Sequence, residues 1–152
     1  MMNDQNPEIG PMSKAEMEAF LAGGEICRVG CLDPDGYPHL VPVWYHYQDG
    51  GFYLVGREKS LWAACMSRDP KATLCVDTLP VVRKVLVRGD AEVLEPPNVG
   101  GRWVEIARAM AYRYLGKDGP KYLEPTMNEP RWLIFLRPHE IKTWQGNYTK
   151  LQ

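Results

Sequence analysis

Residues 36–62 read GYPHLVPVWYHYQDGGFYLVGREKSLW, and this stretch decides the fold. The side chains over residues 38–47 alternate with the period of two that is typical of a strand. One set is Val41, Val43, Tyr45 and Tyr47, and the other is Leu40, Pro42, Trp44 and His46. Asp49-Gly50-Gly51 is typical of a tight hairpin turn. Residues 52–55 then form the returning strand. The stretch therefore predicts a β-hairpin whose second strand leads into a helix that begins near Ser60.

The chain before this hairpin predicts one helix and one strand. Residues 1–12 are polar and contain two prolines, so we expect a loose arm. Ser13 and Glu16 have the spacing of a capping box, which marks the start of a helix. From Glu25 onward the period of the pattern changes to two, and residues 33–36 (DPDG) form a strong turn. This strand and the hairpin together predict a meander of three antiparallel strands.

The chain after the hairpin alternates between helices and further strands. A Pro-Pro pair at 96–97 is expected to end the longest strand, and the clearest amphipathic stripe in the chain follows it. The predicted helices cover residues 60–68 and 98–115, and the predicted strands cover residues 72–77, 83–94, 132–136 and 140–144. Residues 117–130 are predicted to form a loop that includes up to one turn of helix. Seven short strands, without a βαβ crossover before Gly56, favour a mainly β sandwich or small barrel with peripheral helices.

Length, charge and composition narrow the function classes. A chain of 152 residues without a linker is expected to form one domain over residues 13–152. The net charge of −1 gives no electrostatic support for nucleic-acid binding. No apolar run approaches the roughly 20 residues that span a bilayer, and the N-terminus lacks the pattern of a secretory signal. We therefore expect a cytoplasmic protein that binds neither nucleic acid nor membrane.

Cysteine and histidine spacing predicts no metal site. The cysteine spacings match no zinc motif and contain no C-x-x-C pair, so we expect the four thiols to be small buried hydrophobes. His39 and His46 are seven positions apart on one predicted strand, which sends them to opposite faces. The cysteines are Cys27, Cys31, Cys65 and Cys75.

Arg57, Lys59 and Ser60 gather at the predicted start of the helix after the hairpin. Free amide groups at a helix N-terminus carry partial positive charge and bind phosphate or carboxylate. Two cations and a hydroxyl would add donors to such a site. The alternative is that Ser60 only caps the helix while both cations are solvated.

Pro42 lies inside an otherwise strong strand. Proline cannot donate to a ladder, so it marks an edge strand or a bulge. The backbone around Pro42, Val43 and Trp44 would then be free to meet a ligand, and Trp44 could stack on a flat aromatic molecule. A plain edge strand with a core tryptophan is the alternative. No Ser/His/Asp set, paired carboxylates, P-loop or G-x-G-x-x-G is present, so hydrolysis and phosphoryl transfer have no basis.

Three motifs in order resemble the pyridoxamine 5′-phosphate oxidase-like superfamily of flavin-binding split β-barrels. They are DGYPHLVPVWYHYQDGGFYLVGREKS at 35–60, VRKVLVRGDAEVLE at 82–95 and PHEIKTWQG at 138–146. The resemblance covers residues 13–146. It implies a mainly β split barrel of six to seven antiparallel strands that forms a homodimer, with FMN bound at the interface.

The resemblance also implies site residues. The backbone of the first hairpin strand would face the flavin ring, at Val41, Pro42, Val43 and Trp44. The end of the second strand and the helix start would surround the phosphate, at Val55, Gly56, Arg57, Lys59 and Ser60. Lys84 falls where the family places a polar residue against the ring. Trp144 occupies the position of a family tryptophan that approaches the flavin from the partner subunit. No catalytic residue is assigned.

The chain departs from the oxidase itself. The oxidase phosphate segment is S-R-K, whereas Ser60 is followed here by Leu61 and Trp62, so Arg57 and Lys59 would have to supply the charge. The oxidase arginine and lysine of the hairpin strand are replaced by Val41 and His46, and a terminal R-L-H-D-R is absent. The resemblance therefore does not imply pyridoxamine phosphate oxidase activity.

Three functions follow from the resemblance. The first is an FMN-dependent oxidoreductase that acts on a small-molecule substrate or electron acceptor. The second is a reductase that uses the deazaflavin coenzyme F420, whose acidic tail would be met by Arg57, Lys59 and Lys84. The third is a non-enzymatic flavin- or haem-binding module, because the predicted site contains no obvious acid or base.

Overall fold

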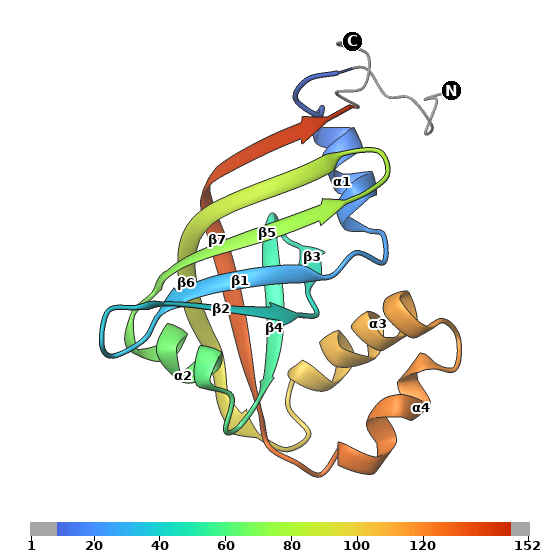
Figure 1. The fold of residues 1–152 in the computed structure, drawn as a ribbon. Helices are drawn as coiled ribbons and strands as arrows, with labels where there is room; N and C mark the ends of the chain where they lie inside the picture. Colours follow the sequence, from blue (N-terminus) through green and yellow to red (C-terminus); the bar gives the residue numbers. More distant parts are fainter. Residues whose placement is uncertain (1–8, 147–152) are drawn as a thin grey trace.

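A computed structural model of the protein describes residues 9–146 (Figure 1). Its strands are β1 Cys27–Leu32, β2 Pro38–Val43, β3 His46–Gln48, β4 Gly51–Arg57, β5 Lys71–Thr78, β6 Arg83–Asn98 and β7 Arg131–Gln145. Its helices are α1 Lys14–Leu21, α2 Leu61–Arg68, α3 Trp103–Leu115, α4 Gly119–Leu123 and the short 3₁₀ helix η1 Glu124–Thr126.

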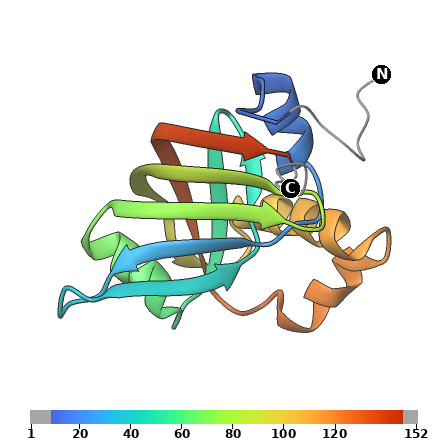
Figure 2. The same cartoon turned by 45° about the horizontal axis from the view of Figure 1, so that its top comes forward.

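All seven strands belong to one antiparallel sheet with the order β2-β1-β5-β6-β7-β4-β3. The two edge strands, β2 and β3, are consecutive in the chain and are joined by Trp44 and Tyr45. The long strands β6 and β7 curve through both halves of the sheet (Figure 2). The sheet is therefore a split β-barrel, as expected. The gap between its two edge strands is here called the seam, and the chain crosses it at Trp44 and Tyr45.

Residues 38–47 were predicted to form one continuous strand, and this prediction was wrong because they form parts of two strands. The chain leaves β2 after Val43 and starts β3 at His46, so the hairpin turn joins β3 to β4 rather than β2 to β4. The turn itself is confirmed, because Asp49 and Gly50 have φ angles of 58° and 72°, as a two-residue hairpin turn requires. The predicted three-stranded meander does not form, since β2 pairs with β1 at the other end of the sheet.

Two predicted strand ends were also wrong. β6 continues through Pro96-Pro97 to Asn98, because the pairing between β6 and β7 shifts register on either side of Glu95. Neither proline is paired with a residue of β7, so the missing proline N–H groups do not interrupt the ladder. Residues 132–136 and 140–144 form one strand, β7, with a third register shift between Arg88 and Gly89 of β6. As a result, the predicted helix 98–115 begins only at Trp103. The helical turn predicted within the loop 117–130 is present as α4, which η1 follows.

Two apolar cores lie on opposite faces of the barrel wall. The barrel core is closed at one end by α2, whose Trp62, Ala63, Cys65 and Met66 are buried. The second core, here called the helix-side core, packs α3 and α4 against β4 and β7. The predicted stripe of α3 supplies it through Trp103, Ile106, Ala107 and Met110. The prediction of buried thiols is confirmed for Cys27, Cys31 and Cys65, while Cys75 is half-buried.

The N-terminal segment is tied to the last strand. The capping box predicted for α1 is confirmed, with Ser13 and Glu16 each accepting from the other's backbone amide. Of the predicted arm, residues 1–8 lie outside the described part of the chain, and Gly10 forms a β-bridge with Gln145. None of the helices formed by residues 9–146 has the length and apolarity that crossing a bilayer requires.

Candidate cofactor site

The residues predicted to bind a phosphate, Arg57, Lys59 and Ser60, lie where the chain passes from β4 into α2. This region is here called the phosphate corner. β4 ends at Arg57, the Ser60 amide donates to the Arg57 carbonyl at 2.9 Å, and α2 begins at Leu61. Ser60 is the N-cap residue of α2, but its side chain makes no capping hydrogen bond. The hydroxyl therefore does not make the capping contact of the alternative interpretation, whereas Arg57 and Lys59 are exposed, as that interpretation expected.

The cations of this corner are only partly balanced. Arg57 Nη1 lies 2.6 Å from Glu129 Oε2, and both side chains are largely exposed, so the pair contributes about 0–1 kcal/mol. Lys59 is exposed in the turn before α2. Arg131 stands opposite Arg57 in the ladder between β4 and β7. Glu129, paired with Arg57, and the exposed Glu58 between Arg57 and Lys59 thus set two acids against three basic residues in this corner.

Arg131 was missed by the sequence analysis. Its guanidinium is buried, lies 4.7 Å from the Trp103 ring centre, and donates to the carbonyl and the hydroxyl of Thr126 at 2.9 and 2.7 Å. Burial first, and then the nearby Arg57 charge, lower the pKa of Arg131. A basic residue directly before the apolar run 132–136 was the available signal, but its burial depends on where α3 and η1 pack.

The predicted ring-facing strand lies next to this corner. The Cys31 thiol is 3.9 Å from the carbonyl oxygen of His39 in β2 and 3.9 Å from that of Trp62 in α2. β2 therefore starts beside the first turn of α2. Its position at a sheet edge confirms only that Pro42 marks an edge strand, and Pro42 is exposed and pairs only with Arg28 of β1. Val41 and Val43, on the other face of β2, pack against the barrel core.

Trp44 leaves β2 and packs on the helices. Its ring stacks on Tyr114 of α3, with 5.0 Å between ring centres and 24° between planes. Tyr122 of α4 lies 5.9 Å from it in a tilted arrangement. Trp44 is half-buried and belongs to the helix-side core rather than to the barrel core. It therefore already has aromatic partners within its own chain.

Lys84 and Trp144 lie apart from the phosphate corner. They are direct neighbours across β6 and β7, whereas Arg57 is level with the opposite end of both strands. β6 is also three strands away from β2 in the sheet order, about 14 Å at the usual strand spacing. Within one chain, the start of β2 therefore lies beside the phosphate corner, whereas Lys84 and Trp144 do not.

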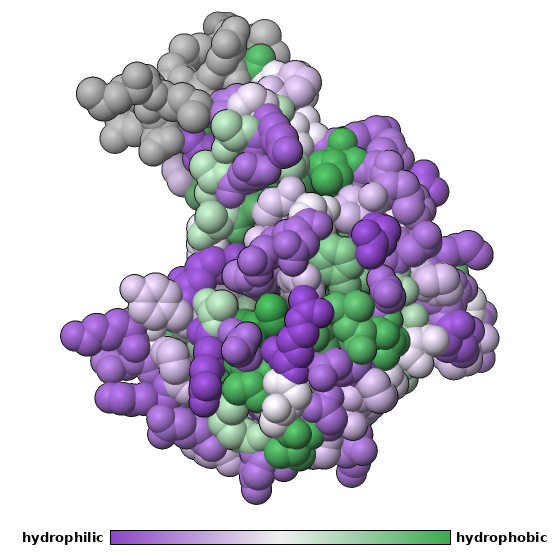
Figure 3. All heavy atoms as spheres, turned by 180° about the vertical axis from the view of Figure 1, so that it is seen from behind, coloured by the Kyte–Doolittle hydropathy of each residue, from purple (hydrophilic) through white to green (hydrophobic). Residues whose placement is uncertain are grey.

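The sheet face that carries Lys84 is partly apolar. Lys84 and Leu86 point to the same side of β6, opposite to the buried Val85 and Val87. Leu86 is 41% exposed, and Leu40 on β2 is 70% exposed. Apolar patches also lie among polar side chains on the side opposite to the view of Figure 1, as Figure 3 shows. The surface thus offers apolar area to a partner.

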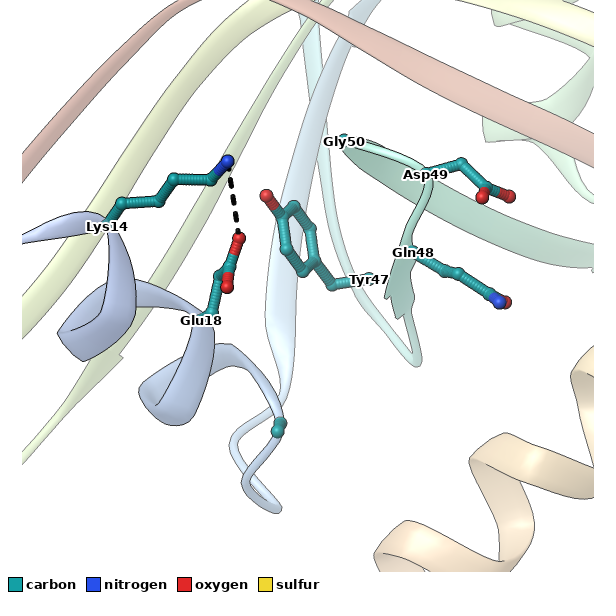
Figure 4. A pocket seen from close by; sticks show the side chains of 7 residues that line it. Lys14, Glu18, Tyr47, Gln48, Asp49 and Gly50 are labelled. Atoms are coloured by element: carbon teal, nitrogen blue, oxygen red, sulfur yellow. Dashed lines mark ion pairs between the residues drawn. The ribbon is translucent and has the colours of Figure 1, made fainter.

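Two depressions lie elsewhere on the surface. One, of about 400 Å³, separates α1 from the β3–β4 hairpin. There the Tyr47 hydroxyl points toward Lys14 and Glu18, which form a 3.9 Å ion pair (Figure 4). The other, of about 300 Å³, is lined by Lys71, Thr73, Arg88 and His139, among others. Neither contains a predicted cofactor residue. Within residues 9–146, no cluster of three or more His, Cys, Asp or Glu side chains is placed to hold a metal ion.

The fold defines a class of protein, the split β-barrels. The sequence profile of the pyridoxamine 5′-phosphate oxidase family matches residues 13–145. The chain belongs to this family. A search of curated proteins finds no match.

Solved structures share the fold at low sequence identity. A conserved hypothetical protein from Mycobacterium tuberculosis has a TM-score of 0.73 at 24% identity, covering 100% of this chain and 94% of the other. A protein described as an F420 reductase has a TM-score of 0.67 at 22% identity, covering 82% and 94%. A FAD-binding protein from Mesorhizobium loti has a TM-score of 0.65 at 17% identity, covering 92% and 98%.

Proposed function

We propose that the protein is an FMN-binding oxidoreductase that works as a homodimer. The observation that carries the proposal is the phosphate corner: Ser60 and the open N-terminus of α2 stand beside Arg57 and Lys59. A helix N-terminus with added cations is suited to a phosphate group. Because the corner also touches the start of the edge strand β2, a phosphate held there would place an attached ring system along β2.

The residues of this chain have binding roles in the proposal. Ser60 and Lys59 hold the phosphate, and Arg57 contributes once its exposed pair with Glu129 opens. The open edge of β2 offers backbone groups to the ring, except at Pro42, which has no N–H to donate. A bound flavin would supply the hydride or electron chemistry. The substrate would be a small molecule or electron acceptor.

The homodimer is inferred from the separation of the site residues. Lys84 and Trp144 stand far from the phosphate corner of their own chain, so they join a cofactor only if a second chain presents them. The exposed Leu40 and Leu86 give the same sheet face an apolar surface for that contact. Each cofactor would then lie between two subunits, with the phosphate on one and Trp144 from the other.

The deazaflavin F420 is the second candidate cofactor. Its tail carries several acidic groups, and the corner formed by Arg57, Lys59 and Arg131 has more basic than acidic side chains. The similar fold of an F420 reductase supports this choice. Pyridoxamine phosphate oxidase activity itself is not proposed, because Leu61 and Trp62 occupy the positions of the oxidase cations.

A side-by-side titration tests the proposal. FMN, F420, haem and riboflavin, which lacks the phosphate, are added separately to cofactor-free protein, and binding is followed by fluorescence or absorbance. We expect FMN to bind more tightly than riboflavin and than haem. If F420 binds more tightly than FMN, F420 becomes the proposed cofactor in place of FMN. Preferential binding of haem would contradict both proposals.

A further inference from the structure

The crossing between β2 and β3 leaves a backbone residue without a strand partner. Tyr45 lies between the two edge strands and pairs with neither neighbour in a ladder. Its side chain is fully buried, so its backbone groups need partners inside the protein. Both partners come from α3: the Tyr45 amide donates to the Tyr114 hydroxyl at 3.4 Å, and the Tyr45 carbonyl accepts from Arg113 Nη2.

Arg113 is committed to this crossing. Its guanidinium lies over the rings of Tyr45 and Tyr114, 4.4 and 4.5 Å from their centres. Nη1 donates to the carbonyl of Leu21, at the end of α1, at 3.1 Å. No ion pair among residues 9–146 includes Arg113, and its buried Nε makes no hydrogen bond there. Its neighbours are therefore aromatic rings and backbone carbonyls, which places it as a structural clamp.

Tyr114 extends the clamp to Trp44 and to β1. Its hydroxyl donates to the carbonyl of Glu25 at 3.0 Å, just before β1, while its ring stacks on Trp44. The Tyr45 hydroxyl donates to the carbonyl of Leu21 at 2.8 Å, the same carbonyl that Arg113 contacts. Two adjacent side chains of α3 thus hold the end of α1, the start of β1 and both residues of the crossing.

We propose that Arg113 and Tyr114 are positioning residues for the cofactor site. They fix the Trp44–Tyr45 crossing, and through it the end of the open edge of β2. The inference rests on the proposed function, since it takes this edge as the surface that faces the cofactor ring. Neither residue is expected to touch the cofactor.

The test compares Arg113→Met with Arg108→Met, which removes an exposed cation from the same helix. Two quantities are measured: the cofactor Kd of the folded protein, and amide hydrogen exchange over residues 41–48 in the cofactor-free protein. We expect Arg113→Met to raise the Kd about tenfold and to speed exchange over residues 41–48. Arg108→Met should change neither. Arg113→Lys keeps the charge but loses the planar fork, so it should fall between the wild type and Arg113→Met.

The inference would be overturned if the Kd and the exchange rate of Arg113→Met stay within twofold of the values for Arg108→Met. If Arg113→Met does not fold, Tyr114→Phe is decisive, because it keeps the ring on Trp44 and removes the hydroxyl that accepts from Tyr45. Faster exchange and weaker binding in Tyr114→Phe support the clamp, and unchanged values refute it. If the wild type binds no cofactor, the proposed function fails, whereas hydrogen exchange still decides whether Arg113 fixes the crossing.

Discussion

Val43 and His46 lie in the two strands at opposite ends of the sheet order, although only Trp44 and Tyr45 separate them in the chain. A flat sheet would keep such edges several strands apart. The short connection therefore requires the sheet to curl until its edges face each other. The resulting seam leaves one side of β2 without a strand partner, and this is the edge along which the cofactor is proposed to lie.

The phosphate corner predicts a selective loss of FMN binding. Lys59→Ala and Ser60→Ala should each raise the Kd for FMN roughly 10- to 150-fold, because a hydrogen bond to a charged group contributes about 1.5–3 kcal/mol. Riboflavin has no phosphate, so its Kd should not change. Arg57→Ala should have a smaller effect, since Glu129 already pairs with Arg57. Fluorescence titration of both ligands measures the difference.

Lys71→Ala is the matched control for this prediction. Lys71 is an exposed cation at the start of β5, outside the predicted site. Its removal should leave both Kd values within twofold of the wild type. An equal loss of FMN and riboflavin in the Lys59 and Ser60 variants would contradict a phosphate contact and indicate a general disturbance of the fold.

The exposed sheet face predicts that oligomerisation and cofactor binding are linked. Leu86→Arg places a charge on the proposed dimer surface and should convert the particle from twice the chain mass of 17.3 kDa to a single chain. The Kd for FMN should rise with it, because Lys84 and Trp144 then no longer reach the cofactor of a partner. Light scattering after size exclusion, combined with titration, measures both.

Leu115→Arg is the control for the surface itself. Leu115 is 50% exposed at the end of α3, on a different part of the molecule. This variant should remain a dimer with unchanged affinity. A Leu86→Arg monomer that binds FMN as tightly as the wild type would show that the site is complete within one chain.

Local signals in the sequence predicted most turns and helices, but not which strands become neighbours. The capping box at Ser13 and the Asp49-Gly50 turn depend on adjacent residues alone, and both predictions were confirmed. The break at Trp44–Tyr45 depends on contacts with α3, which is distant in the chain. Alternation of side chains continues through the break, so the pattern suggested one strand. Likewise, a register shift between β6 and β7 accommodates Pro96 and Pro97, and only the partner strand reveals it.

Gly89 is predicted to be indispensable for the bend shared by β6 and β7. A Cβ atom at this position would lie 2.2 Å from the backbone oxygen of Arg137. Backbone cannot move aside as a flexible side chain can, so Gly89→Ala should lower the free energy of unfolding by about 1–3 kcal/mol. Urea denaturation measures the loss. Gly24→Ala is the control, because no atom lies within 4 Å of the added methyl group and the change should be within about 1 kcal/mol.

The buried thiols predict that stability declines in alkali. Burial raises the pKa of Cys27 to about 12 and that of Cys31 to about 11. In the unfolded chain both thiols ionise with a pKa of about 8.5. The protonated thiols therefore stabilise the fold fully below that pH, and the contribution is lost as the pH rises toward the folded pKa values. Each group should lower the free energy of unfolding by about 1.4 kcal/mol per pH unit within this window.

Urea denaturation between about pH 7.5 and about pH 10 checks this dependence. Cys27→Ala should flatten the decline, and Cys75→Ala should flatten it less, because Cys75 is only half-buried. A free energy of unfolding that stays constant or rises over this range would contradict the assignment of buried, protonated thiols.

The geometry of the candidate site was predictable where it depends on one segment and not where it depends on packing. Ser60 and Lys59 follow from the start of a helix after a strand, which a sequence pattern reveals. Arg113 and Arg131 are basic residues whose surroundings are built by distant elements: Tyr45 and Leu21 for the first, Thr126 and Trp103 for the second. Their charges gave no signal that they would be enclosed by rings and carbonyl groups.

The cofactor content of the purified protein tests the central claim most directly. The protein is incubated with FMN, desalted, and examined by absorbance and by light scattering on the same sample. We expect one FMN to be retained per chain in a two-chain particle, with a flavin spectrum that differs from that of free FMN. A colourless protein that retains neither FMN nor F420 after desalting would contradict it.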